Sequence, residues 1–309
     1  HLDRFHSFSV YTVYTTLLFC YHYPDLSNPK GANFMDLTYI MFTKHLEGLD
    51  VPGIIDALQS VGVQGADLCV RDGYPVNPGN ITTALPEAAK RFADQGLSIP
   101  LVTAPGDFNR PDIDYAEAYY AAMGEAGVGH VKLGYWHWEP EKGYWDQLDK
   151  IRGYMEGFQA LSAKHGVKTV VHNHSGKSMG LNSCAAMNIV KDCDPQHVGI
   201  FADPGHLSIC GEPIAMALDI VKEYLSLLAF KDLIHQRPLG SSKQGPPSAG
   251  VMRLGQGFGD WPALIATLER LDFKGPVSFH SEYSGETVET VIDLARIDVR
   301  FFNNLRTKE

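Results

Sequence analysis

Short runs of β-branched and aromatic residues alternate with longer amphipathic runs from residue 34 to the end of the chain. This alternation is typical of parallel strands that are joined by helices. Several of the amphipathic runs end in glycine, as helices commonly do. The eight predicted strands cover residues 35–42, 66–70, 98–103, 130–135, 168–173, 198–202, 225–230 and 276–281. The sequence therefore predicts an α/β protein built from repeated pairs of strand and helix.

Eight such pairs favour a (β/α)8 TIM barrel over a doubly wound sheet, because no GxGxxG follows the first strand. No change of composition marks a second domain, so we predict a single barrel domain over residues 34–309. Residues 1–33 are interpreted as an N-terminal extension, because their aromatic run is too rich in Tyr and Thr for a signal peptide. In a TIM barrel, side chains at the C-terminal ends of the strands meet at one mouth.

Charge and composition exclude several classes of partner. The formal net charge is -10, and no cluster of Lys and Arg suits a phosphate backbone, so no nucleic acid is expected. No run approaches the roughly 20 apolar residues that cross a bilayer, so no membrane is expected. The five cysteines include no CxxC pair and predict neither disulfides nor a zinc knuckle. A cytoplasmic location is favoured over export, and homo-oligomerisation stays open.

Polar residues follow four of the later predicted strands. His172 and His174 are two residues apart, so both side chains face the same side of a strand. One of them could equally be a core histidine. Asp203 ends the next strand, with His206 one helical turn later, although Asp203 could also serve only as a helix N-cap.

The last two strands end in the same way. Lys231 and Asp232 follow residues 225–230, and Lys231 could hold a substrate oxyanion or pair with Asp232 or Asp203. Glu282 follows the eighth strand, with His280 two residues earlier on the same side. A carboxylate at this place could bind a divalent cation or act as a base, unless it is an ordinary surface residue.

Other residues near strand ends are candidates for contacts with the substrate. Arg71 ends the second strand, and Lys132 lies within the fourth, where a buried lysine needs a carboxylate partner. Trp136 and His137 end the fourth strand, where aromatic rings can stack on a sugar. The long Gly, Pro and Ser-rich segment 235–259 is predicted to be a lid or a binding loop without structure of its own.

These motifs, in this order, make residues 34–303 resemble the xylose isomerase-like barrel superfamily of sugar isomerases and epimerases. The segments that carry the resemblance are GVQGADLCV, HNH, DPGH, the KD pair, GQGFGDW and GPVSFHSEY. The resemblance implies a divalent metal held by a Glu, an Asp, a His and a Glu at the ends of strands five to eight. It matches Asp203 and Glu282 to two of these ligands and His206 to a histidine that contacts substrate. His172 stands in place of the strand-five Glu, and Ala229 in place of the strand-seven His.

We therefore predict a metal site of His172, Asp203 and Glu282 that takes Mn²⁺, Mg²⁺, Co²⁺ or Zn²⁺. The predicted catalytic residues are Glu282, His172, His206 and Lys231. The predicted substrate contacts are His174, Arg71, Trp136, His137 and His280, and the predicted substrate is a small carbohydrate. The expected reaction is isomerisation or epimerisation by proton transfer alpha to a carbonyl.

Two alternatives stay open. A lyase could begin with the same proton abstraction and then expel a glycosidic substituent from a keto-glycoside. A carbohydrate-binding barrel without catalysis could also result if the changes at His172 and Ala229 have ended metal binding. A trinuclear zinc nuclease on the same barrel is disfavoured, because it needs more His and Glu ligands and a less acidic surface.

Overall fold

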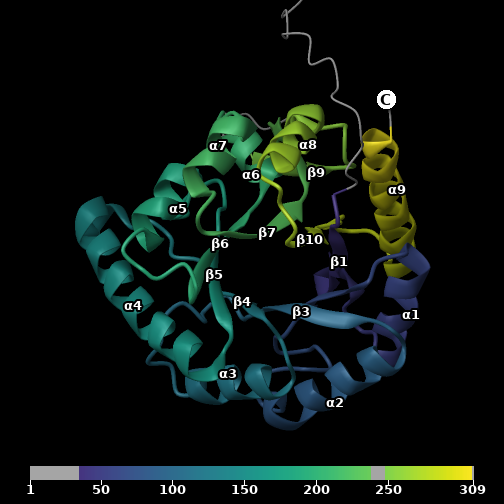
Figure 1. Cartoon of the computed structure of the whole chain (residues 1–309), viewed down its shortest axis with the longest axis horizontal. Helices are drawn as coiled ribbons and strands as arrows, with labels where there is room; N and C mark the ends of the chain where they lie inside the picture. Colours follow the sequence, from purple (N-terminus) through teal and green to yellow (C-terminus); the bar gives the residue numbers. More distant parts are fainter. Residues whose placement is uncertain (1–34, 238–247, 308–309) are drawn as a thin grey trace, which may run out of the picture. The chain divides into compact units, whose positions relative to one another are not determined.

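Eight parallel strands close into a barrel, which confirms the predicted (β/α)8 fold. The computed structural model describes residues 35–237 and 248–307. The strands of the barrel are β1 (Thr38–Phe42), β2 (Gly65–Cys69), β3 (Ser98–Thr103), β4 (His130–Lys132), β5 (Lys168–His172), β6 (Val198–Ala202), β7 (Leu225–Phe230) and β10 (Pro276–Phe279). Their order around the barrel is β1, β10, β7, β6, β5, β4, β3, β2 (Figure 1). The predicted extension, residues 1–33, lies outside the described residues, so the division into extension and domain stays a prediction.

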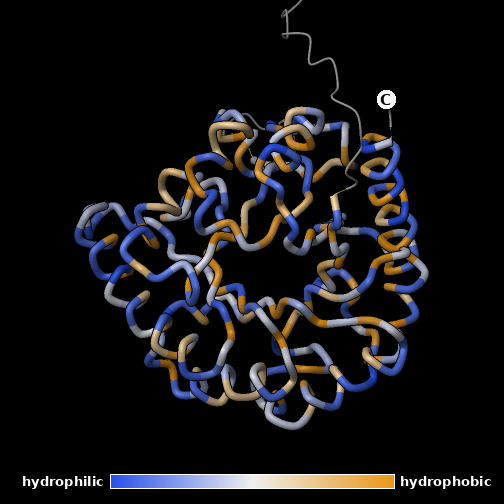
Figure 2. The backbone as a smooth tube through the Cα atoms, viewed as in Figure 1, coloured by the Kyte–Doolittle hydropathy of each residue, from blue (hydrophilic) through white to orange (hydrophobic). Residues whose placement is uncertain are grey.

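Helices surround the barrel on its outside (Figure 1). They are α1 (Val51–Val61), α2 (Ile81–Asp94), α3 (Ala116–Glu125), α4 (Tyr144–His165), α5 (Ser183–Val190), α6 (Pro204–Ile209), α7 (Ile214–Val221), α8 (Trp261–Arg270) and α9 (Val288–Arg306), with 3-10 turns η1 (Thr43–Leu46) and η2 (Pro140–Lys142). Hydrophobic residues gather between helices and strands, and hydrophilic ones face outward (Figure 2). Of the helices described, none is long and apolar enough to cross a membrane.

The strand register decides which side chains point into the barrel. Partners on neighbouring parallel strands face the same side, and every second residue along a strand faces that side again. Val170 belongs to the apolar cluster inside the barrel, and its partner on β4 is Lys132. Lys132 and, two residues after Val170, His172 therefore point inward. The apolar plug below them consists of Ile40, Leu101, Val170, Phe201, Leu227 and Ala229.

A hairpin occupies part of the segment that was predicted to be an unstructured loop. Strands β8 (Asp232–Gln236) and β9 (Ser248–Met252) pair antiparallel, outside the barrel. The expectation of a loop without structure over residues 235–259 was therefore wrong in part. The Gly and Pro content of the segment hid two short strands that stabilise each other by pairing. Residues 238–247, which connect them, lie outside the described residues.

Asp232, at the start of β8, holds the glycine-rich stretch after this hairpin. Its carboxylate accepts hydrogen bonds from the backbone N–H groups of Leu233, Gly255, Gly257 and Gly259, and from Nε1 of Trp261, at 2.9–3.1 Å. A Cβ on Gly257 would lie 2.2 Å from Oδ1 of Asp232, so only glycine lets the loop wrap this closely. The second half of the KD pair is thus a structural anchor.

Candidate active site and metal centre

Three buried polar atoms in the described part of the chain have no hydrogen-bond partner. They are Nε2 of His172, Oδ2 of Asp203 and Nδ1 of His280. The ligand atoms of these three residues all lie within 4.8 Å of one another. Unpaired polar atoms are costly inside a protein, and three that converge in this way indicate a missing common partner. One imidazole nitrogen, one carboxylate oxygen and a second imidazole nitrogen suit a divalent transition metal.

His172 ends β5 and is fixed by a tyrosine. Its Nδ1 lies 2.8 Å from Oη of Tyr135. When Nδ1 carries the proton of the neutral ring and donates to Tyr135, Nε2 keeps a free lone pair. Burial, followed by the positive charge of Lys132, holds the pKa of His172 well below its usual range. The ring is therefore neutral at physiological pH, which is the state that binds metal.

Asp203 follows β6 and lies at the N-cap of α6. Its Oδ1 accepts a hydrogen bond of 3.1 Å from the backbone N–H of His206, whereas Oδ2 has no hydrogen bond and lies 3.4–3.8 Å from nitrogens of His172, His206 and Lys231. The backbone of Asp203 is held by Asn173, whose Oδ1 accepts from its N–H at 2.7 Å and whose Nδ2 donates to its carbonyl. Gly205 completes the turn, because a Cβ there would lie 2.5 Å from the carbonyl oxygen of Lys231 on the neighbouring segment. The N-cap and the ligand interpretations of Asp203 are compatible, since they use different oxygens.

His280 follows β10 and pairs with a buried aspartate on β2, which is separated from β10 by β1 alone. Its Nε2 lies 3.2 Å from Oδ2 of Asp67, which also accepts from Ser278, while Thr103 donates to Oδ1. A proton on Nε2 leaves Nδ1 free, as in the carboxylate and histidine pairs that support metal sites. Burial lowers the pKa of His280, but the carboxylates of Asp67 and Glu282 outweigh burial and raise the pKa above its usual value.

Asp67→Asn is expected to weaken divalent-metal binding roughly 10- to 100-fold, the usual cost of losing such a supporting partner. The amide can no longer fix the proton on Nε2, so the ring loses its preferred tautomer. Titration of the purified protein with Mn²⁺, followed by calorimetry, measures the effect. Thr103→Val removes a donor to Asp67 without removing its charge and serves as the milder control. Metal affinity that is the same in Asp67→Asn as in the parent protein would contradict this role.

Glu282, the predicted third ligand, lies beside this group and is paired with two lysines. It forms an ion pair with Lys231 and a second one, of 2.8 Å, with Lys44. Its Oε2 is 3.7 Å from Nδ1 of His280. Burial would raise the pKa of Glu282, but Lys231, His280 and Lys44 hold it well below its usual range. Its role as a ligand or base stays a prediction, and the structure adds His280 to the candidate ligands.

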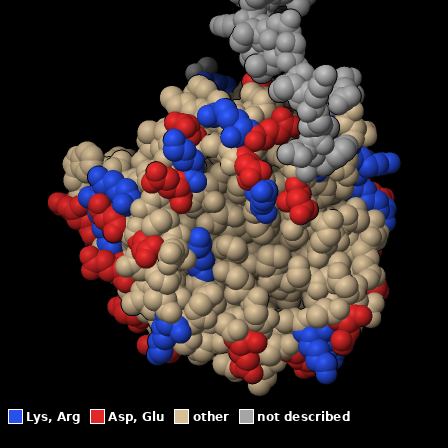
Figure 3. All heavy atoms as spheres, in the orientation of Figure 1, with Lys and Arg blue, Asp and Glu red and all other residues tan. Residues whose placement is uncertain are grey.

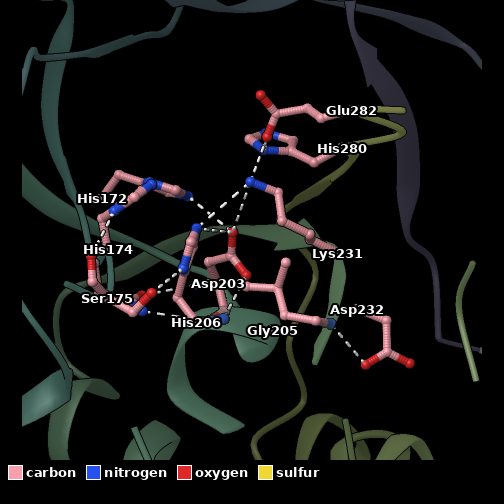
Figure 4. A network of polar contacts seen from close by, with 12 residues as sticks. His172, His174, Ser175, Asp203, Gly205, His206, Lys231, Asp232, His280 and Glu282 are labelled. Carbon is pink, nitrogen blue, oxygen red and sulfur yellow. Dashed lines mark hydrogen bonds and ion pairs between the residues drawn. The ribbon is translucent and has the colours of Figure 1, made fainter. Parts of the chain in front are cut away.

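Lys231 connects the two carboxylates at the mouth. Its Nζ lies 3.8 Å from Oδ2 of Asp203 and pairs with Glu282, as Figure 4 shows. Asp232 points away from it and toward its own hydrogen-bond donors. Of the two predicted pairings of Lys231, the structure contains the one with Asp203. Burial lowers the pKa of Lys231, and the two carboxylates outweigh this and raise it.

Two more histidines border the same group. The rings of His174 and His206 lie 3.9 Å apart between centroids, and Nδ1 of His206 is 2.8 Å from Oγ of Ser175. Nε2 of His206 lies 3.5 Å from Nζ of Lys231 (Figure 4). Burial holds the pKa of His206 well below its usual range, opposed only in part by Asp203. Burial and Lys231 also lower the pKa of His174, so both rings are neutral and able to accept a proton.

The other predicted contacts are more scattered. Trp136 donates from Nε1 to the carbonyl of Asn109 and packs against the outer core. His137 is exposed and forms a bridge with Ser178. Arg71 is half-buried, with Nε 3.4 Å from the carbonyl of Ala104. Within the described residues, Trp136 and His137 form no hydrogen bond with His172, Asp203 or His280, and their substrate contacts stay predictions.

Sequence reasoning did not find Asp67, Tyr135 or Asn173. Asp67 carried a signal, since an aspartate in the middle of an apolar predicted strand has to be buried and paired. Tyr135 and Asn173 carried none, because both residue types are ordinary at strand ends. Lys132 is buried as predicted, yet no carboxylate oxygen of the described residues lies within 4.0 Å of its Nζ.

Comparisons with known proteins place the chain among related barrels. The family model for the xylose isomerase-like TIM barrel matches residues 55–305. No curated protein matches the chain in sequence.

Several solved structures share the fold. D-psicose 3-epimerase, solved in the presence of D-fructose, is 11% identical with a TM-score of 0.67, over 88% of this chain and 100% of that one. The IOLI protein with a binding zinc atom is 16% identical with a TM-score of 0.66, over 88% and 100%. The 3-keto-D-glucoside 4-epimerase YcjR from E. coli is 14% identical with a TM-score of 0.65, over 87% and 99%. At these identities the likeness shows the fold alone.

Proposed function

The chain belongs to the xylose isomerase-like TIM barrel family, and from that premise we propose that it is a divalent-metal-dependent isomerase or epimerase of a carbohydrate. The observation that carries the proposal is the convergence of three buried, unpartnered donor atoms from His172, Asp203 and His280 at one point. Three of the similar structures, two sugar epimerases and a zinc-binding protein, support the same proposal.

The metal would be held by His172, Asp203 and His280, and when bound it supplies a Lewis acid for a substrate carbonyl or hydroxyl. Lys231 lies next to these residues and carries a positive charge, so it stabilises the oxyanion that develops when a proton leaves the carbon beside a carbonyl. Glu282 is a carboxylate at neutral pH and is the proposed base, which substrate entry would free from Lys231.

A second proton-transfer group is needed for epimerisation, since the proton must return to the other face of the carbon. His206 is proposed for this step: its neutral, buried ring takes a proton from the ammonium group of Lys231, 3.5 Å away, and passes it to the carbon, and the proton held by Glu282 then restores Lys231. Ser175 orients the ring through Nδ1. These residues surround one small volume, as general acid and base catalysis requires.

Proton exchange with solvent tests the proposal directly. The Mn²⁺-supplemented protein is incubated with D-fructose and with a 3-keto-glucoside in deuterated water, and proton NMR follows loss of the C–H signal beside the carbonyl. Exchange that stops in Glu282→Gln and in His206→Gln supports the assignment. Exchange followed by release of the glycosidic substituent identifies the lyase alternative. Sugar binding without exchange and without metal binding would support the non-catalytic barrel and contradict the proposal.

A further inference from the structure

Two basic side chains at the mouth, Lys132 and Arg71, have no carboxylate partner among the described residues. Lys44 and Lys231 both pair with Glu282, and Lys231 also faces Asp203. The carboxylate of Asp67 forms hydrogen bonds with His280, Ser278 and Thr103. Every carboxylate of the site is thereby engaged. Lys132 and Arg71 are left, and neither has a carboxylate oxygen within 4.0 Å in the part of the chain that the structure describes.

Lys132 is a buried cation that points into the barrel. It ends β4 opposite Val170, whose side chain lies in the interior cluster, and only 4% of the residue is exposed. Its Nζ lies 3.9 Å from the centre of the Tyr135 ring and makes no hydrogen bond with a described residue. The face of a tyrosine offsets only a small part of the cost of burying an ammonium group. Burial, followed by the positive charge of Arg71, lowers the pKa of Lys132 to about 7, and a ligand of opposite charge beside Nζ would stabilise its charged form.

Arg71 lies close to Lys132 across the intervening strand. Its Nε is 3.4 Å from the carbonyl of Ala104, and the N–H of Ala104 donates to the carbonyl of Lys132 at 3.0 Å. The terminal nitrogens of the guanidinium make no hydrogen bond with a described residue. Arginine offers a planar pair of donors that fits a carboxylate or a phosphate, and lysine adds a point charge.

The three candidate metal ligands and these two basic residues lie on different parts of the barrel. His172, Asp203 and His280 come from β5, β6 and β10, whereas Arg71 and Lys132 come from β2 and β4. Tyr135 joins the two parts, because its ring faces Lys132 and its hydroxyl contacts His172. A short sugar can therefore place its carbonyl end at the candidate metal ligands and its opposite end at Arg71 and Lys132. On the face shown in Figure 3, acidic and basic side chains are mixed, so binding of an anion depends on these local charges.

We propose that Arg71 and Lys132 form an anion subsite, and that the substrate is a sugar bearing a carboxylate or a phosphate. This inference rests on the proposed function for the role of the sugar as substrate. The subsite itself rests on the two unpaired cations and could be present in a carbohydrate-binding barrel as well.

The test compares three sugars of the same shape by ligand-observed NMR titration: D-glucose, D-glucuronate and D-glucose 6-phosphate. The parent protein is expected to bind at least one of the two anions roughly 10- to 100-fold more tightly than glucose, as charge-assisted hydrogen bonds allow. The anion with the larger gain identifies the preferred group. Each titration is run with and without Mn²⁺, because a carboxylate held by Arg71 and Lys132 keeps its advantage without metal.

Lys132→Met and Arg71→Gln are expected to remove most of this advantage while glucose binding stays the same. Lys132→Met replaces an unpaired buried charge by an apolar chain of similar length, so it is expected to fold, and Arg71→Gln provides an independent second variant. Lys164→Met, at a lysine whose side chain is 62% exposed, is the matched control and should keep the advantage. Equal binding of glucose and both anions, or an advantage that survives both variants, would overturn the subsite.

The two proposals fail separately. Loss of the anion preference with proton exchange intact refutes the subsite and leaves the enzyme proposal standing. An anion preference that depends on Lys132, in a protein that exchanges no proton with any of the sugars tested, refutes the enzyme proposal and leaves the subsite standing.

Discussion

Asp203→Asn is expected to lower the affinity for Mn²⁺ by more than about 100-fold, which exceeds the cost of losing a supporting residue. Oδ1 of Asp203 accepts from the N–H of His206 and caps α6, so an asparagine would keep its own oxygen at that place. Its amide nitrogen would then take the position of Oδ2, next to Nε2 of His172. A nitrogen that carries two protons offers no lone pair to a metal. Calorimetric titration with Mn²⁺ measures the change.

A second helix offers a matched control for this substitution. Asp260 caps α8 through the N–H of Ala263 and precedes a Trp-Pro pair, but it is exposed and is not one of the three residues of the candidate metal site. Asp260→Asn should therefore leave Mn²⁺ binding unchanged. If Asp203→Asn binds Mn²⁺ as the parent protein does, the assignment of Asp203 as a ligand is wrong.

Asp232→Ala is expected to lower the free energy of unfolding by about 3–5 kcal/mol, because several buried hydrogen-bond donors lose their acceptor at once. The substitution leaves four backbone N–H groups and the indole N–H of Trp261 without their acceptor. Asp232 is fully buried, so water cannot replace the carboxylate without rearrangement of the loop. Chemical denaturation followed by circular dichroism gives the free energy directly.

Asp219→Ala is the control for this loss, since Asp219 has a side chain that is 54% exposed and, within residues 35–237 and 248–307, forms an ion pair only with Lys222. A change of a few tenths of a kcal/mol is expected there, as for other exposed ion pairs. Equal stability of Asp232→Ala and Asp219→Ala would show that the glycine-rich loop does not depend on the carboxylate.

The barrel could be predicted from the sequence because its strands are short runs of β-branched and aromatic residues with polar ends. The ends of these runs were less certain, since β4 stops at Lys132 although residues 133–135 continue the apolar pattern. Backbone hydrogen bonds to β3 and β5 decide where the strand stops, and such partners are not visible in one sequence.

The choice between His280 and Glu282 shows the same difficulty at the site. The sequence places both residues on one side of an extended chain, whereas in the structure the N–H of Glu282 donates to the carbonyl of His280 at 2.7 Å and the chain turns between them. Strand β10 ends at Phe279, so His280 lies level with the donors from β5 and β6, and Glu282 reaches the lysines above. Asp67, which fixes His280, comes from the far end of the sequence and could not be connected with it in advance.

Because β1 pairs with β10, the barrel closes only when its first and last strands have met. The histidine that follows β10 is aligned by an aspartate of β2, so the complete set of proposed ligands exists only in the closed ring. An ion that binds this set and not the open chain must raise the melting temperature in proportion to the logarithm of its concentration. The concentration of the ion would then set the stability of the folded protein as well as its catalytic rate.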